Sequence, residues 1–364
     1  MAGRIWEVIQ RVVLLVLGLG LVSICGGSAY RVYRHRQIAK ATMIDPATGI
    51  DEAMFIRVGG IEQWITIRGQ YRENPVLLFL HGGPGVATSP YPRDVHFVWS
   101  KDFTFVQWDQ RGSGKTYGRS GPLAPDVTID RVAQDGVELA EFLRQHLHKR
   151  KIIVLGLSWG TTLGIYMVKA RPDLFYAYVG TGQMVNAREA ETITYRQVLD
   201  KARARGDRDA IKELEHIGPP PYASQAALGV QRKWGRAYEP GLQSNLSMIS
   251  KVLFESDVGF RDLRDYIRGI NDSQDHFIGV AADGPDTKVD LPALGTDFAI
   301  PMFVFEGAED DVAPAGPAKA YVDSMVAPQK QFVAIANAGH TAMYSRADVF
   351  LRLLVERVRP LAIQ

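Results

Sequence analysis

Short apolar runs rich in β-branched residues recur along the chain and are typical of strands buried on both faces of a parallel sheet. The clearest lie at residues 76–80, 103–108, 152–155, 176–179, 301–306 and 331–335. Two further runs, 53–57 and 61–67, flank Gly59-Gly60 as in a hairpin. Helical apolar periods at 129–147, 163–170 and 350–358 alternate with these runs. The pattern predicts an α/β domain with a mostly parallel sheet and helices on both faces.

Strand patterns nearly vanish between residues 185 and 297. Helical stretches at 187–205, 207–216 and 224–234 are joined there by Pro- and Gly-rich breaks. A helical block that interrupts a sheet near its carboxyl edge is typical of a cap over a binding site. We therefore expect four parts: an N-terminal segment (1–50), a first core part (51–184), a helical cap (185–297) and a second core part (298–364).

The N-terminal segment has its own apolar stretch. Residues 12–30 contain no charged side chain and, as a helix, would cross about 30 Å of hydrocarbon. We expect a transmembrane helix that anchors the protein in a membrane, followed by an irregular basic linker to residue 50. The alternative is a signal peptide cleaved near Gly27-Ser28-Ala29, with export of the rest. Basic residues lie on both sides of the stretch, so its orientation is left open.

Composition narrows the function classes. Charged residues make up 23% of the 364 residues and the net charge is +2, which gives no indication of a nucleic-acid surface. Cys25 is the single cysteine, so no intrachain disulfide can form. The sequence contains no zinc-ligand spacing, phosphate-binding glycine loop or dinucleotide fingerprint, so neither a metal nor a cofactor is expected. Oligomeric state is left open.

The pattern Gly156-Leu157-Ser158-Trp159-Gly160 lies between a predicted strand and a predicted helix. A strand that passes straight into a helix through Gly-x-Ser-x-Gly holds the serine in a tight turn, where the glycines remove steric clashes. The hydroxyl of Ser158 would then stand at the carboxyl end of the sheet, beside unpaired N–H groups of the helix N-terminus. The pattern also occurs by chance, but in this context it indicates a serine nucleophile.

A second glycine-rich turn, His81-Gly82-Gly83-Pro84-Gly85, follows the buried run at 76–80. Such a turn lets backbone N–H groups point at a ligand, as an oxyanion hole requires. The loop 109–115 follows another predicted strand, but its spacing does not fit a phosphate-binding loop. We expect Asp109 and Arg111 to hold that loop by charge-assisted hydrogen bonds.

A serine nucleophile needs a base and an orienting acid, which in this architecture follow later in the chain in the order Ser, acid, His. Two loops after late strands offer them: 306–314 contains Asp310 and Asp311, and 337–341 contains His340. We expect His340 to be the base and one of the two aspartates to be the acid.

These motifs together resemble the α/β-hydrolases of the proline iminopeptidase (prolyl aminopeptidase) type. The matching segments are residues 81–85, 109–114, 156–160, Gly307 to Pro314, and Gly339-His340. The family's acid lies three residues after a glycine and four before a proline, so the resemblance implies Asp310. It also implies an oxyanion hole formed by the N–H of Trp159 with that of Gly82 or Gly83.

Substrate recognition in this family uses cap glutamates that bind a free N-terminal amine, often after a tryptophan-rich helix. Trp234 to Glu239 is similar but one residue wider, so the resemblance makes Glu239 a candidate substrate-binding residue. Residues 179–184 lack the arginine found in well-matched family members.

The expected function is a membrane-anchored serine hydrolase, an aminopeptidase that releases N-terminal residues, proline foremost, through an acyl-enzyme. An esterase or amidase acting on small apolar acyl substrates is the first alternative. A non-catalytic membrane-tethered binding module is the second. A small peptide or acyl substrate is the expected partner in either enzyme.

Overall fold

The computed structural model describes residues 2–240, 245–255 and 257–363. The chain forms two compact units. The smaller comprises residues 1–43, 91–97 and 244–257, and the larger comprises 44–90, 98–243 and 258–364.

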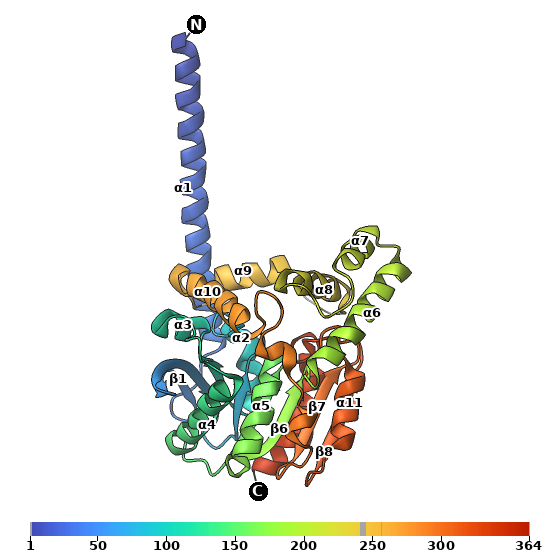
Figure 1. Ribbon diagram of the computed structural model, residues 1–364. Coiled ribbons are helices and arrows are strands. Elements are labelled where there is room, and N and C mark those ends of the chain that lie inside the picture. Colours follow the sequence, from blue (N-terminus) through green and yellow to red (C-terminus); the bar gives the residue numbers. More distant parts are fainter. Residues whose placement is uncertain (1, 241–244, 256, 364) are drawn as a thin grey trace. The chain divides into compact units, whose positions relative to one another are not determined.

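An eight-stranded sheet lies at the centre of the larger unit (Figure 1). Its strands are β1 (Ile50–Val58), β2 (Ile61–Gly69), β3 (Val76–Leu80), β4 (Thr104–Asp109), β5 (Ile152–Leu157), β6 (Phe175–Thr181), β7 (Met302–Gly307) and β8 (Lys330–Ile335). They are ordered β1-β2-β4-β3-β5-β6-β7-β8. The pairs β1–β2 and β2–β4 are antiparallel, and all others are parallel. The predicted mostly parallel sheet is confirmed.

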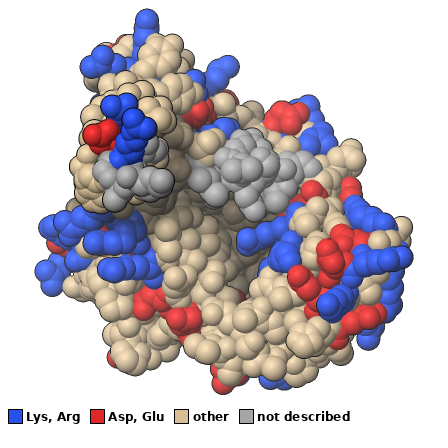
Figure 2. Space-filling view, turned by 90° about the horizontal axis from the view of Figure 1, so that it is seen from above, with Lys and Arg blue, Asp and Glu red and all other residues tan. Residues whose placement is uncertain are grey.

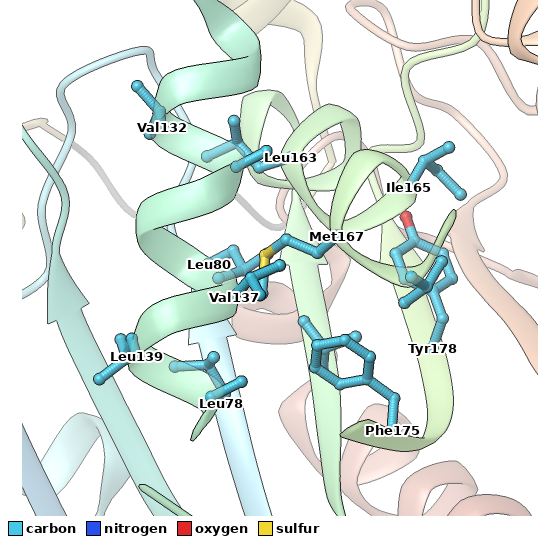
Figure 3. Close-up of a cluster of buried hydrophobic side chains, with 14 of the residues drawn as sticks. Leu78, Leu80, Val132, Val137, Leu139, Leu163, Ile165, Met167, Phe175 and Tyr178 are labelled. Carbon is cyan, nitrogen blue, oxygen red and sulfur yellow. The ribbon is translucent and has the colours of Figure 1, made fainter. Parts of the chain in front are cut away.

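Each face of the sheet is covered by helices, because the strands are apolar on both sides. One face packs against α4 (Ile129–His146), α5 (Trp159–Ala170) and α11 (Ala315–Ser324). Figure 3 shows this layer, in which Val137 of α4 and Met167 of α5 meet Leu78 and Leu80 of β3. The other face packs against α13 (Ala347–Leu353) and the turn of π-helix η5 (Leu354–Val358).

The interval between β6 and β7 is helical in its described part, as the expected cap is. In the larger unit it contains α6 (Ala187–Arg205), α7 (Arg208–Ile217), α8 (Gln225–Tyr238) and α10 (Phe260–Phe277), while residues 241–244 and 256 lie outside the described residues. The side chains of Asn186, Asp207 and Ser224 cap the first three helices. Lys/Arg and Asp/Glu are interspersed where α6 and α7 lie (Figure 2), and they pair as in Arg203–Glu215.

The remaining elements of the larger unit are short connections near the ends of the strands. They are α3 (Gly114–Ser120), α12 (Ala342–Ser345), η1 (Val98–Lys101), η2 (Pro172–Leu174), η3 (Pro285–Lys288), η4 (Pro292–Leu294) and η6 (Arg359–Ala362).

The smaller unit consists of α1 (Ala2–Ala41), α2 (Arg93–Phe97) and α9 (Asn245–Glu255). Arg34 of α1 forms a 2.7 Å ion pair with Glu255, and Tyr30 meets Phe254 edge to face. The expected helix at 12–30 is too short and the expected irregular linker from residue 31 is wrong, since α1 continues to Ala41. Residues 31–41 contain neither glycine nor proline and are rich in good helix formers, so nothing in them stops the helix.

Candidate active site

Ser158 stands at the junction between β5 and α5. Its backbone has φ 54° and ψ −122°, a region that non-glycine residues rarely occupy. Its N–H donates to the carbonyl of Thr181 at the end of β6 (3.0 Å). A methyl group on Gly160 would lie 2.1 Å from the carbonyl oxygen of Leu80, and one on Gly156 would lie 2.5 Å from the carbonyl oxygen of Gly160. The two glycines therefore permit the close approach of strand, turn and helix.

The turn after β3 lies against this serine. A Cβ on Gly82 would be 3.2 Å from the Cβ of Ser158, so the two backbones are neighbours. Gly83 has φ 128°, where side chains are strained. Among the described residues no group accepts the N–H of Gly82, Gly83 or Trp159. These three donors, predicted to form the oxyanion hole, are thus free to bind a developing anion beside the N-terminus of α5.

Buried polar groups fix the position of that turn. The N–H of Gln110 donates to Nε2 of His81 (3.3 Å), which places the ring proton on Nδ1, 2.8 Å from the carbonyl of Gly82. Burial lowers the pKa of His81 to about 4, so the ring is neutral at physiological pH. The side chain of Gln110 donates to the carbonyl of His81 and accepts from Nε1 of Trp159 (3.0 Å). The glycine turn, the 109–114 loop and α5 are therefore joined.

Asp109 and Arg111, expected to hold their loop, make charge-assisted hydrogen bonds. Asp109 Oδ2 accepts from the hydroxyl of Ser89 and from the N–H of Lys115, each at 2.7 Å. Arg111 binds both carboxylate oxygens of Asp135 on α4 and donates to the carbonyl of Gly59. The loop is thereby tied to α4 and to the β1–β2 turn.

The predicted base and acid meet at the carboxyl ends of β7 and β8. Nδ1 of His340 lies 2.8 Å from Oδ2 of Asp310, whose other oxygen accepts the N–H groups of Val312 (2.7 Å) and Ala313 (2.8 Å). Burial alone would raise the pKa of Asp310, but His340 and these hydrogen bonds outweigh it and hold the pKa below its usual value. The neighbouring Asp311 instead pairs with Lys201 of α6 (2.6 Å).

The ring of His340 packs against Gly182, the residue that follows β6. A Cβ on Gly182 would lie 2.8 Å from Cε1 of His340, and Gly182 directly follows Thr181, which binds the N–H of Ser158. No hydrogen bond within 3.5 Å joins the Ser158 hydroxyl to His340 among the described residues. Such bonds are often long without substrate and shorten in the Michaelis complex.

Glu239 directly follows helix α8 and lies on the His340 loop. Its Oε1 accepts the N–H of Thr341 (3.1 Å), and its side chain fills the space beside the α-carbon of Gly339. Burial raises the pKa of Glu239, against the favourable charge of His340. The candidate substrate-binding carboxylate is therefore next to the predicted base, with Oε1 already engaged.

Two contributions were missed from the sequence. Helix α10 packs directly on the glycine turn: the hydroxyl of Ser273 donates to the carbonyl of Gly112 (2.9 Å), and a Cβ on Gly85 would lie 2.7 Å from that of Ser273. The small residues Gly269 and Ser273, four apart on one helix face, are the signal that was available. The other contribution is Glu306, a carboxylic acid with no exposed surface at the end of β7.

Comparisons with known proteins bear on the same core. Residues 75–347 match the model of a family described as alpha/beta hydrolase fold. The protein named "Probable aminopeptidase YbaC" of Bacillus subtilis is 27% identical over 84% of this chain and 95% of its own length. A proline iminopeptidase of Lactobacillus helveticus is 25% identical over 48% of this chain and 61% of its length.

Among solved structures, the fold is similar to that of a proline iminopeptidase of Mycobacterium smegmatis. The TM-score is 0.61, the identity is 17%, and the match covers 86% of this chain and 99% of the other. At this identity the likeness concerns the fold alone.

Proposed function

Because the chain belongs to the family of the alpha/beta hydrolase fold, we propose that it is a serine hydrolase that acts as an aminopeptidase on peptides, with N-terminal proline preferred. The hydrogen bond of 2.8 Å between His340 and Asp310 carries this proposal, because it orients the imidazole beside the strained Ser158 turn. The relatives named aminopeptidase and proline iminopeptidase support the choice of substrate.

In the proposed mechanism Asp310 accepts the Nδ1–H of His340, which leaves the lone pair on Nε2 to take the proton of Ser158. The serine oxygen attacks the carbonyl carbon, and the N–H groups of Trp159 and of Gly82 or Gly83 stabilise the oxyanion. The imidazolium then gives its proton to the departing amine and leaves an acyl-enzyme. Water deprotonated by His340 releases the acid product.

Glu239 is proposed to bind the free amine of the substrate. Its Oε1 is held by the N–H of Thr341, and this contact leaves Oε2 for an ammonium group next to the reacting carbonyl. The esterase and amidase alternative requires no such carboxylate. A substitution at Glu239 therefore distinguishes the aminopeptidase from the esterase or amidase.

The first experiment is labelling of the full-length protein with a fluorophosphonate probe. We expect the wild type to be labelled and Ser158→Ala not to be labelled. The turnover of Ser158→Ala should fall by several orders of magnitude, while its free energy of unfolding should change by no more than about 1 kcal/mol. An unlabelled wild-type protein would support the binding-module alternative instead.

The second experiment compares a proline arylamide with a short-chain nitrophenyl ester. In Glu239→Gln the KM for the arylamide should rise about tenfold or more, while the kinetics of the ester change little, because only the arylamide carries an ammonium group. Glu213→Gln, an exposed carboxylate paired with Lys233 on the cap, is the matched control. If Glu239→Gln lost activity equally on both substrates, Glu239 would instead serve to support the His340 loop. If the wild type hydrolysed the ester in preference to the arylamide, the esterase alternative would be favoured.

A further inference from the structure

Glu306 is a fully buried carboxylic acid at the carboxyl end of a central strand. The rest of β7 before it, residues 302–305, is apolar, and the side chain of Glu306 has no exposed surface. An isolated carboxylate in such a place costs several kcal/mol of solvation, so its presence calls for specific partners.

Those partners come from two loops of the candidate active site. Oε1 accepts the N–H of Gly182 (3.0 Å), and Oε2 accepts the N–H of Gln183 (2.8 Å). The carboxyl group also lies close to that of Asp310, where a hydrogen bond between them can form if one of the two is protonated. Glu306 thus joins the turn after β6, on which the ring of His340 packs, to the acid that orients this ring.

A hydrogen bond between two carboxyl groups needs one proton, and the surroundings decide which group keeps it. Each of the two groups receives two backbone N–H groups, but only Asp310 faces His340, and this contact favours the ionised form of Asp310. Burial raises the pKa of Glu306 well above its usual range, and the nearby charge of Asp310 adds to that effect. These effects favour the proton on Glu306 over Asp310.

The other ionisable groups around this pair agree with that assignment. Glu239 faces His340 and Asp310 from the cap, and the phenol of Tyr178 faces Glu306 from β6. Asp311, next to Asp310, is paired with Lys201. An ionised Glu306 would add a further negative charge to a group of carboxylates around one imidazole.

We propose that Glu306 is a positioning residue for the triad: as a neutral acid it donates a hydrogen bond to Asp310 while its two oxygens fix the Gly182–Gln183 turn. The inference rests on the proposed function, because it concerns the same base and acid. It assigns Glu306 two tasks. The side chain keeps Asp310 aligned with the Gly182–Gln183 turn, on which the His340 ring packs. As a neutral group it does so without adding a negative charge beside His340.

The test compares Glu306→Gln and Glu306→Ala in the full-length protein. Glutamine is neutral and can still donate to Asp310, so we expect the acid limb of the pH profile of kcat/KM to move by less than about 0.3 unit. In Glu306→Ala kcat should fall about tenfold to a hundredfold with KM nearly unchanged, because the base and acid lose their alignment. The control Glu213→Gln should change neither. A downward shift of the acid limb by about one unit or more in Glu306→Gln would mean that wild-type Glu306 is ionised, and would overturn the inference.

Infrared difference spectra supply a readout that does not depend on activity. At pH 7 the wild type minus Glu306→Gln should show the carbonyl band of a protonated carboxylic acid, and a carboxylate band in its place would contradict the inference. This measurement decides the state of Glu306 even where Glu306→Ala fails to fold. If the wild type is neither labelled by the fluorophosphonate nor active, the proposed function fails while the infrared band still answers the question for Glu306.

Discussion

Two buried ionisable side chains, His81 and Asp109, lie next to the glycine turn, and burial shifts both pKa values towards the neutral form. The pKa of His81 falls from 6.5 to about 4, and the pKa of Asp109 rises from 3.8 to about 6. Between about pH 4 and pH 6 the unfolded chain therefore binds the proton of His81 while the folded protein does not. For Asp109 the folded protein binds the proton in the same window while the unfolded chain does not. Their effects on stability have opposite signs.

The sign follows from linkage between protonation and folding. As the pH falls from 6.5 to 4, His81 lowers the free energy of unfolding by about 3 kcal/mol, and Asp109 raises it by a similar amount between pH 6 and 3.8. Asp109→Asn should remove the second contribution. We expect the free energy of unfolding of the wild type, relative to that of Asp109→Asn, to rise by about 3 kcal/mol between pH 7 and pH 4.

Urea unfolding followed by tryptophan fluorescence at several pH values measures this difference. His81→Gln should give a difference of the opposite sign, which serves as the internal control. Parallel pH curves for the wild type and Asp109→Asn would show that Asp109 has the same pKa in the folded and unfolded chain.

At the scale of elements, the junction of β5 and α5 depends on the absence of a side chain at Gly160. A methyl group there meets the backbone oxygen of Leu80, and β3 is held between β4 and β5 and cannot retreat. Gly160→Ala should destabilise the protein by about 3 kcal/mol and abolish labelling by the fluorophosphonate. Gly229→Ala is the matched control, because nothing lies within 4 Å of a Cβ at this position of α8. It should leave labelling intact and stabilise slightly. Normal labelling of Gly160→Ala would refute the steric account.

The elements that the sequence predicts well are those whose signal is local. The run 152–155, the glycine pair around Ser158 and the apolar helix after it are adjacent, so β5 and α5 follow from one window. The hydrogen bond between His340 and Asp310 joins two loops that each follow a predicted strand. Parallel strands bring such loops to one edge of the sheet.

The features that the sequence does not predict depend on contacts between residues far apart in the chain. In the sequence, Glu306 looks like any polar residue at the end of a strand. Its role depends on the contact with Gly182, which lies 124 positions earlier in the chain. The packing of α10 on Gly85 depends in the same way on two segments far apart in the sequence. The C-terminal part of α1 escapes prediction for a different reason: the charge of residues 31–41 is typical of an irregular linker but is equally compatible with a helix.

For the whole molecule, the long apolar helix α1 bears on where the protein resides. Its residues from Ile9 to Ala41 are long and apolar enough to cross a membrane, and the side chains from Val12 to Ile24 are exposed. A signal sequence near the N-terminus passes the same test. We propose an uncleaved single-pass anchor, with a mature chain that keeps its first 29 residues.

Charge placed within the apolar stretch tests the anchor. In the double variant Leu15→Arg, Leu19→Arg we expect release from the membrane pellet on alkaline washing, because each arginine near the centre of a span costs about 3 kcal/mol. Tyr33→Arg, outside the apolar stretch, should stay in the pellet. Intact mass measurement distinguishes the alternatives: a chain that begins after Ala29 would establish a cleaved signal peptide and contradict the anchor.

The smaller unit is assembled from three stretches that are distant in sequence, residues 1–43, 91–97 and 244–257. A protease that cut the backbone once, just after Met43, would sever α1 from the chain, yet the Arg34–Glu255 ion pair and the Tyr30–Phe254 contact would still hold it to α9. In mild detergent the nicked protein should therefore elute as one particle, and it should come apart into two fragments only in denaturant.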